Sequence, residues 1–297
     1  MPPSHRDHFI AAPDGLKLHV RDDGPREAGR LPVICLAGLT RTVEDFDALT
    51  PVLAHDAGAP RRVVAIDSRG RGLSERDPEP ANYTIAVEAA DVLAVAATLG
   101  IGRAIIVGTS RGGLIALTLA AMMPALLAGV VFNDVGPVLG MAGLLRIKGY
   151  AGRITRPTSW AEAARAHKAL FGRDFPNVTD EGWMRWARRS WREVDGRFKG
   201  TCDPHVADGF AAIDPANPPP PLWPLYDALP DIPLMVIRGA LSDLLDPETV
   251  AGMAARRPRL EVWEVPGEGH APLLEDAPTI SRIAAFVRRC DGKAPVA

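Results

Sequence analysis

The sequence predicts an α/β fold in which helices flank a mostly parallel, eight-stranded sheet and a helical segment interrupts the alternation. Short apolar runs alternate with helix-like segments between 31 and 132, a pattern typical of parallel strands that are buried on both faces. The same alternation resumes after 230. Between 136 and 230 the pattern is helical and closes on a proline run at 218–221, which suits neither a helix nor a central strand.

The elements follow in order along the chain. The first two strands are separated by Asp14-Gly15, a pair that favours a hairpin turn. Strands are expected at 8–12, 16–22, 31–36, 62–66, 104–107, 127–132, 233–237 and 260–265. Helices are expected at 43–54, 87–99, 111–123, 141–150, 160–171, 180–198, 247–255 and 279–289.

These elements predict one core, made of 1–135 and 231–297, with a helical cap at 136–230 inserted between two strands of the same sheet. Two consecutive domains are the alternative. The strands that follow the insertion are too few to build a second domain, so we favour the inserted cap.

Composition limits the classes of partner. The chain has 297 residues, of which 47% are hydrophobic and 24% charged, and its net charge is -2. This balance argues against a nucleic-acid or anionic-membrane surface, because both favour clustered Lys and Arg. The three cysteines form no C-x-x-C pair, so neither a zinc site nor a disulfide framework is indicated. Residues 1–7 lack the apolar region of a signal peptide. We expect a cytoplasmic monomer or homodimer that acts on a small molecule.

A candidate nucleophile lies between a predicted strand and a predicted helix. Residues 108–112, GTSRG, match G-x-S-x-G in the strand–turn–helix context that this motif requires. The small glycines permit a sharp turn that exposes the hydroxyl of Ser110. The backbone N–H of Arg111 then points to where an oxyanion would form, and the N–H of Leu39, in the loop after the third strand, is the second candidate donor.

His270 is the candidate base. It lies in the glycine-containing loop 266–270, after the last predicted strand and before the last helix. The other six histidines lie near the terminus, within an early strand, or on expected surface helices and the cap. An imidazole is suited to accept a serine proton near neutral pH.

Two aspartates compete for the acid that would orient this imidazole. Asp243 follows the strand at 233–237 and gives the chain order serine, aspartate, histidine. Asp134 also follows a strand directly. We favour Asp243 and keep Asp134 as its rival.

Substrate contacts are expected from the cap and from the loop that carries Leu39. Arg41, Trp183, Trp186 and Tyr150 are the candidates. The aromatic side chains either line an apolar pocket or fill the core of the cap. The guanidinium groups of Arg41 and Arg111 either bind a substrate carboxylate or pair with acidic residues of the protein.

Together these segments resemble the α/β-hydrolase superfamily over nearly the whole chain. Residues 65–74, AIDSRGRGLS, are similar to its D-x-R-G-x-G-x-S segment, and 265–270, VPGEGH, to its histidine loop. The resemblance implies the α/β-hydrolase fold and a catalytic triad of Ser110, Asp243 and His270. It also implies ester hydrolysis through an acyl-enzyme, with no metal or organic cofactor.

One departure concerns the oxyanion loop. Many members have His-Gly where this chain has Ala37-Gly38. The loop therefore loses a side chain that often braces it, while the backbone donor is retained.

The resemblance leaves the reaction open within the superfamily. Hydrolases of C–C bonds in meta-cleavage products, lactonases and perhydrolases use the same triad. A ligand-binding receptor on the same fold is a further alternative. Epoxide hydrolases and haloalkane dehalogenases of this fold carry Asp at the nucleophile position, so Ser110 argues against those two chemistries.

Overall fold

The computed structural model describes residues 5–26, 29–153 and 155–292. An eight-stranded sheet with the order β1-β2-β4-β3-β5-β6-β9-β10 forms its centre. Strand β2 pairs antiparallel with β1 and β4, and the remaining pairs are parallel. The predicted mostly parallel sheet is therefore confirmed. The strands are β1 (Arg6–Ala11), β2 (Lys17–Asp23), β3 (Val33–Leu36), β4 (Val63–Ile66), β5 (Ala104–Thr109), β6 (Leu127–Asn133), β9 (Leu234–Gly239) and β10 (Glu261–Val265).

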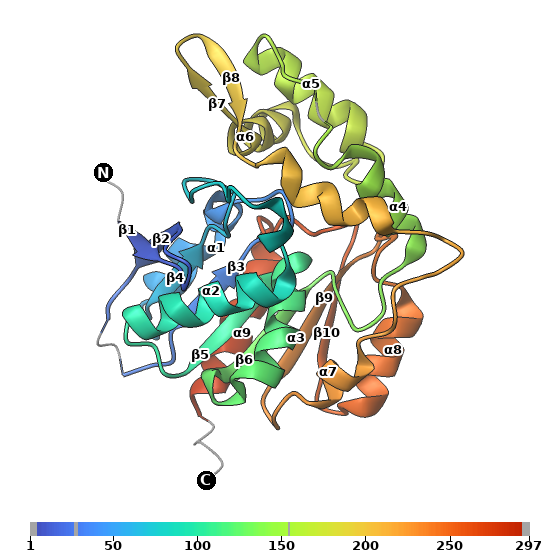
Figure 1. Ribbon diagram of the computed structural model, residues 1–297. Coiled ribbons are helices and arrows are strands. Elements are labelled where there is room, and N and C mark those ends of the chain that lie inside the picture. Colours follow the sequence, from blue (N-terminus) through green and yellow to red (C-terminus); the bar gives the residue numbers. More distant parts are fainter. Residues whose placement is uncertain (1–4, 27–28, 154, 293–297) are drawn as a thin grey trace.

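Helices cover both faces of the sheet (Figure 1). Apolar side chains of α2, α3, α7 and α8 pack on one face, and those of α1 and α9 pack on the other. The central strands β3, β4, β5 and β6 are buried along their full length, as expected for strands covered on both sides. These helices are α1 (Leu49–Ala54), α2 (Ile85–Thr98), α3 (Arg111–Met122), α7 (Trp223–Asp227), α8 (Pro247–Arg256) and α9 (Ala277–Asp291).

The elements between residues 140 and 213 lie above the sheet in Figure 1, and in the structure we call this group the cap. Strand β9, which follows the cap in sequence, pairs directly with β6, which precedes it. The chain on both sides of the cap thus shares one sheet, which argues against two consecutive domains. The cap contains α4 (Met141–Tyr150), α5 (Trp160–Phe171), α6 (Asp180–Ser190), the hairpin β7 (Trp191–Val194) and β8 (Arg197–Gly200), and the 3-10 helix η4 (Pro204–Ala212). Shorter 3-10 helices elsewhere are η1 (Val43–Phe46), η2 (Pro80–Asn82) and η3 (Pro124–Leu126).

Two details of the insertion differ from expectation. The helix expected at 180–198 ends at Ser190, and the chain continues as the hairpin β7–β8. Asp195 and Gly196 at its tip both have positive φ, which is the requirement of a type I′ turn. The insertion was also expected to extend to 230, but Tyr226 of α7 is buried in the main core, and its hydroxyl donates to the Met253 carbonyl.

The parallel strands bring the key loops to one edge. Ser110 follows β5, Asp134 follows β6, and His270 lies in the loop after β10. Because the carboxyl ends of parallel strands meet at the same edge of a sheet, these residues can converge beneath the cap. In the part of the chain that the structure describes, none of the helices has the length and apolar character needed to cross a membrane.

Candidate active site

Ser110 stands in the sharp turn between β5 and α3, with backbone angles φ 51° and ψ -113°. A positive φ is uncommon for a residue with a side chain and is maintained here by close packing around the turn. A Cβ atom at Gly112 would lie 2.1 Å from the Leu36 carbonyl oxygen, and one at Gly108 would lie 2.6 Å from the Gly112 backbone. Both positions therefore require glycine, which lets the helix begin close to the sheet and leaves the Ser110 side chain at the sheet edge.

His270 lies against this serine. Its Nε2 atom is 2.8 Å from the Ser110 Oγ atom, and its Nδ1 atom is 2.8 Å from Oδ2 of Asp134. Since an ionised carboxylate only accepts hydrogen bonds, Nδ1 carries the proton and Nε2 can accept from the serine hydroxyl. The structure thus brings together the predicted nucleophile and base, and only 8% of the His270 surface is exposed.

Asp134, the rival of Asp243 in the sequence analysis, is the acid that contacts His270. Its side chain is fully buried, with 0% exposure. Oδ1 accepts from the Gly239 backbone N–H at 2.8 Å, and Oδ2 accepts from the Ser242 hydroxyl at 2.6 Å as well as from His270. Three donors therefore replace the water that this carboxylate loses on burial, and they fix its orientation toward the imidazole.

The prediction that Asp243 is the acid partner of His270 is wrong in this structure. Asp243 accepts two hydrogen bonds from Arg146 of α4, at 2.6 Å from Nε and 2.7 Å from Nη2. Burial would raise the pKa of Asp243, but the hydrogen bonds and charge of Arg146 outweigh it and lower the pKa. The cap arginine engages the Asp243 carboxylate, while Ser242, the residue before it, donates to Asp134.

The two candidate oxyanion donors lie in segments close to the nucleophile. Arg111 is the first residue of α3, directly after Ser110. A Cβ atom at Gly38 would lie 3.7 Å from the Ser110 Cβ atom, so the loop that continues into Leu39 runs beside the serine. The loop of Leu39 and the start of α3 therefore both lie near the Ser110 side chain, which is compatible with the predicted pair of oxyanion donors.

The loop that carries Leu39 is braced by charged side chains. Arg71, which is 1% exposed, donates from Nε to the Leu39 carbonyl at 2.8 Å. Asp67 accepts from the Val43 backbone N–H at 2.8 Å. Arg71 and Asp67 belong to the D-x-R-G-x-G-x-S segment noted in the sequence, which here supplies bracing that Ala37 cannot.

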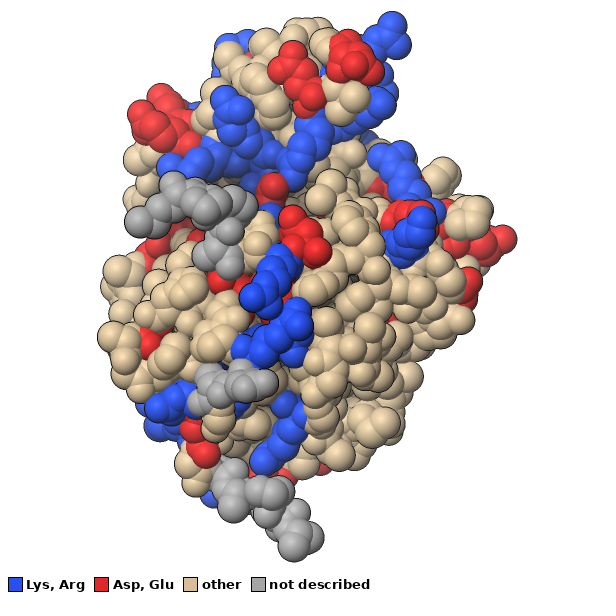
Figure 2. Space-filling model, turned by 90° about the vertical axis from the view of Figure 1, so that its left-hand side faces the viewer, with Lys and Arg blue, Asp and Glu red and all other residues tan. Residues whose placement is uncertain are grey.

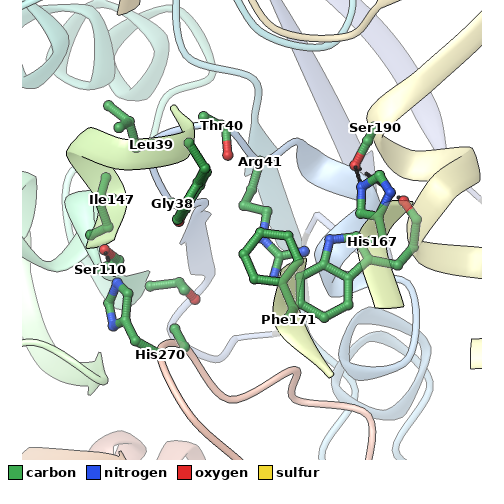
Figure 3. A pocket seen from close by; sticks show the side chains of 14 residues that line it. Gly38, Leu39, Thr40, Arg41, Ser110, Ile147, His167, Phe171, Ser190 and His270 are labelled. Carbon is green, nitrogen blue, oxygen red and sulfur yellow. Dashed lines mark hydrogen bonds between the residues drawn. The ribbon is translucent and has the colours of Figure 1, made fainter. Parts of the chain in front are cut away.

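A pocket of about 60 Å³ lies between Ser110 and the cap. Figure 3 shows Ser110 and His270 at one end, His167 and Ser190 at the other, and Arg41 between them. Mixed apolar and polar walls with a few directed polar groups are typical of small-molecule sites. Its lining residues are Gly38, Leu39, Thr40, Arg41, Thr109, Ser110, Ile147, Tyr150, His167, Phe171, Trp186, Ser190, His270 and Ala271.

Three of the four predicted substrate-binding residues line this pocket: Arg41, Trp186 and Tyr150. Trp183 does not line it. The indole of Trp183 is 2% exposed and stacks on Trp186, with ring centroids 5.4 Å apart. It therefore fills the core of the cap, which was the alternative interpretation of these aromatic residues, and supports Trp186 from behind.

His167 was not predicted to be a site residue; its position in the sequence suggested the cap or a surface helix. In the structure His167 is 3% exposed and contributes to the pocket wall. Its Nδ1–H donates to the Ala163 carbonyl at 2.8 Å, which leaves Nε2 to accept from the Ser190 hydroxyl at 3.0 Å. A usable signal was present, because His167 and Phe171 are four residues apart and share the inward face of α5.

The charge of the pocket wall is concentrated on one residue, while two of its other titratable groups, His167 and Tyr150, are neutral. Burial lowers the pKa of His167, with a contribution from the Arg41 charge, so this imidazole is neutral near pH 7. Burial raises the pKa of Tyr150, which keeps its phenol protonated. Among the described residues that line the pocket, Arg41 alone carries a permanent charge. On the outer surface, Lys and Arg side chains gather at the height of the cap (Figure 2).

Glu268, two residues before His270, is a buried carboxyl group in the same loop. Burial raises its pKa to about 7, and the charges of Asp276 and Glu275 act in the same direction. The backbone N–H of Leu273 donates to Oε2 at 2.8 Å and opposes the shift. The folded protein thus binds this proton more tightly than the unfolded chain, whose ordinary value is 4.5. Stability from this group is present below pH 4.5 and is lost as the pH rises to about 7.

Substitution Glu268→Gln should therefore flatten the pH dependence of unfolding. Gln keeps an oxygen for the Leu273 N–H but has no proton to release. The melting temperature of the variant minus that of wild type should be larger at pH 8 than at pH 5, by about 2–4 °C or more. Calorimetry at both pH values measures this difference. If the difference in melting temperature between the two proteins were the same at pH 5 and pH 8, the raised pKa of Glu268 would be contradicted.

Comparisons with known proteins agree with the architecture. The alpha/beta hydrolase family matches residues 33–282. A 3-hydroxybutyrate-oligomer hydrolase from Cupriavidus necator is 32% identical over 282 residues, covering 93% of this chain and 94% of the relative. A 2-(acetamidomethylene)succinate hydrolase from Mesorhizobium japonicum is 28% identical over 267 residues, covering 89% and 90%.

A solved structure gives the same answer. The crystal structure of an α/β hydrolase from Novosphingobium aromaticivorans superposes with a TM-score of 0.89 at 38% identity. The match covers 97% of this chain and 100% of that one. A family match of this extent, a similarity of this length and a shared sheet topology lead to one conclusion: this chain belongs to the alpha/beta hydrolase family.

Proposed function

We propose that this protein is a serine hydrolase that cleaves a small carboxylic ester or a related acyl compound through an acyl-enzyme. One observation carries the proposal: the chain of hydrogen bonds from Ser110 through His270 to Asp134, which faces a pocket beneath the cap. Serine is a weak nucleophile until a neighbouring base takes its proton, and an acid must hold that base in the correct tautomer.

The first half of the reaction forms the acyl-enzyme. Ser110 Oγ attacks the ester carbonyl carbon while its proton passes to Nε2 of His270. The backbone N–H groups of Leu39 and Arg111 stabilise the negative charge that develops on the carbonyl oxygen. His270 then gives the proton to the departing alcohol, and Asp134 stabilises the imidazolium in between.

The second half reverses these roles. A water molecule attacks the acyl-enzyme carbonyl while Nε2 of His270 takes one of its protons. The proton then returns to Ser110 Oγ as the C–O bond to the enzyme breaks and the carboxylic acid leaves. One water is consumed and the enzyme is restored, so the residues present suffice for the balance of the reaction.

The comparisons support ester bonds as the target. The Cupriavidus relative is named for hydrolysis of 3-hydroxybutyrate oligomers, and oligomers of a hydroxy acid are joined through ester bonds. The Mesorhizobium relative is named for the hydrolysis of a different compound. Membership of the family therefore does not determine which type of bond is cleaved. We therefore rest the choice of an ester on the former similarity together with the site geometry.

Substitution Ser110→Ala should abolish esterase activity without unfolding the protein. Removal of the nucleophile of a triad costs up to about 10⁶ in kcat, so we expect a loss of at least about 10⁴ in kcat/KM for p-nitrophenyl acetate. Initial rates with purified wild type and variant measure this loss, and circular dichroism controls for folding. Wild-type turnover that survives the substitution would refute the proposal.

The two aspartates give a second, matched test. Asp134→Asn should lower kcat by about 10⁴, because Asn can donate to His270 and stabilise the wrong tautomer. Asp243→Asn should lower kcat by less than about 10-fold, because Asp243 contacts Arg146 rather than the imidazole. Steady-state kinetics of both variants on one ester provide the comparison. Equal losses, or a larger loss in Asp243→Asn, would return Asp243 to the role that the sequence suggested.

A further inference from the structure

We propose that Arg41 binds a carboxylate of the substrate, so that the preferred substrates are esters that carry a free carboxylate a few bonds from the scissile carbonyl. This inference rests on the proposed esterase function and names its substrate class. It is carried by the position of the guanidinium, its incomplete hydrogen bonding and the charges around it.

The side chains of Arg41 and Ser110 both start close to Gly38. A Cβ atom at Gly38 would lie 3.4 Å from Cγ of Arg41 and 3.7 Å from Cβ of Ser110. From there Arg41 extends across the pocket (Figure 3). Its Cζ atom lies 4.2 Å from the ring centroid of Trp186, so the aromatic ring holds the guanidinium plane in place.

The guanidinium of Arg41 has N–H donors that the described residues do not use. Its Nε atom is 3.4 Å from Oδ2 of Asp45, while its Nη1 atom is buried and has no hydrogen-bond partner among the described residues. A buried donor without a partner is destabilising and is uncommon in folded proteins. The guanidinium thus has hydrogen-bonding capacity that these residues leave unused, and its planar fork of N–H groups suits a carboxylate in particular.

The other arginine that follows a catalytic loop is already engaged. Arg111 donates from Nε and Nη2 to the two carboxylate oxygens of Glu88, and from Nη2 to the Tyr83 carbonyl. From the sequence, substrate binding and internal pairing are both open for these two arginines. In the structure Arg111 pairs internally, which leaves Arg41 as the candidate that lines the pocket.

The surroundings leave positive charge at Arg41. Asp45 lies near Arg41 but is shared with Arg189, whose Nη1 atom is 3.9 Å from the other Asp45 oxygen. Glu275 pairs with Arg189 at 2.6 Å and with Arg185 at 3.3 Å. With Asp47, which pairs with Arg21 and also acts on Arg189, the network joins four guanidinium groups to three carboxylates. In a pocket with largely uncharged walls, the remaining charge attracts an anion more strongly than it would in water.

The size of the site narrows the substrate further. The pocket beside Ser110 is about 60 Å³ and adjoins a larger cavity of about 340 Å³, which shares Thr40 and Ser190 with it. The small space beside Ser110 favours a short carboxylate-bearing unit next to the scissile ester. An oligomer of a short hydroxy acid has this form, and it would be cut at the ester bond nearest its free carboxylate.

A matched pair of esters tests the inference. 3-Butanoyloxybutanoate carries a carboxylate, and 3-butanoyloxybutanamide replaces it with a neutral group of similar shape. We expect wild type to prefer the acid, and Arg41→Gln to lower the ratio of kcat/KM values, acid over amide, by about 30-fold, mainly through the KM for the acid. Arg41→Lys should restore part of the ratio because it keeps the charge. Initial rates of product formation, measured by chromatography, give kcat and KM for each of the two esters.

Arg282→Gln is the control, because it removes one positive charge from α9, where Arg282 stacks on Trp263 outside the pocket. Its ratio should equal that of wild type. A wild-type ratio near one, or a ratio that Arg41→Gln leaves unchanged, would overturn the carboxylate site while turnover of p-nitrophenyl acetate still supported the esterase. Absence of turnover with every ester would instead defeat the proposed function.

Discussion

The buried carboxylate of Asp134 is the constraint on which the site depends. It accepts from His270, from the Gly239 backbone and from the Ser242 hydroxyl, so it joins the ends of β6 and β9 to the loop after β10. A charge removed from water needs such donors, and their loss would leave an uncompensated ion in the core. The same three bonds that make burial tolerable also set the position of the imidazole relative to Ser110.

The cap is connected to this arrangement through the loop after β9. Arg146 of α4 holds Asp243, and the backbone N–H groups of Gly140 and Gly143 donate to the carbonyls of Leu244 and Asp243. Ser242, one residue earlier, donates to Asp134. The loop 242–244 therefore contacts the cap through Asp243 and Leu244 and contacts Asp134 through Ser242.

Much of the fold could be predicted because strands that are buried on both faces of a sheet appear in the sequence as continuous apolar runs. Strands such as β3 and β5 are continuous apolar runs, and the turn at Ser110 is marked by glycines that the packing requires. The hairpin β7–β8 was missed because Trp191 and Phe198 fit an amphipathic helix as well as a strand, although Asp195-Gly196 was a turn signal.

The choice between Asp134 and Asp243 could not be made from the sequence. Both follow strands at the same edge of the sheet. What distinguishes them is contacts with residues distant in the chain, such as that of Asp243 with Arg146 and that of Asp134 with Gly239. The roles of His167 and Ser190 depend in the same way on how the cap helices pack over the core. Local patterns specify elements, whereas these contacts are set by tertiary packing.

The proposed chemistry requires a serine that is activated by its neighbours, and covalent labelling tests this requirement most directly. Diethyl p-nitrophenyl phosphate transfers its phosphoryl group to an activated serine and releases p-nitrophenol. After labelling, trypsin should release residues 104–111, between Arg103 and the site after Arg111, as the modified peptide. Mass spectrometry that places the adduct on Ser110 is the predicted result. An unmodified 104–111 peptide, or an adduct on another residue while hydrolysis stops, would contradict the account.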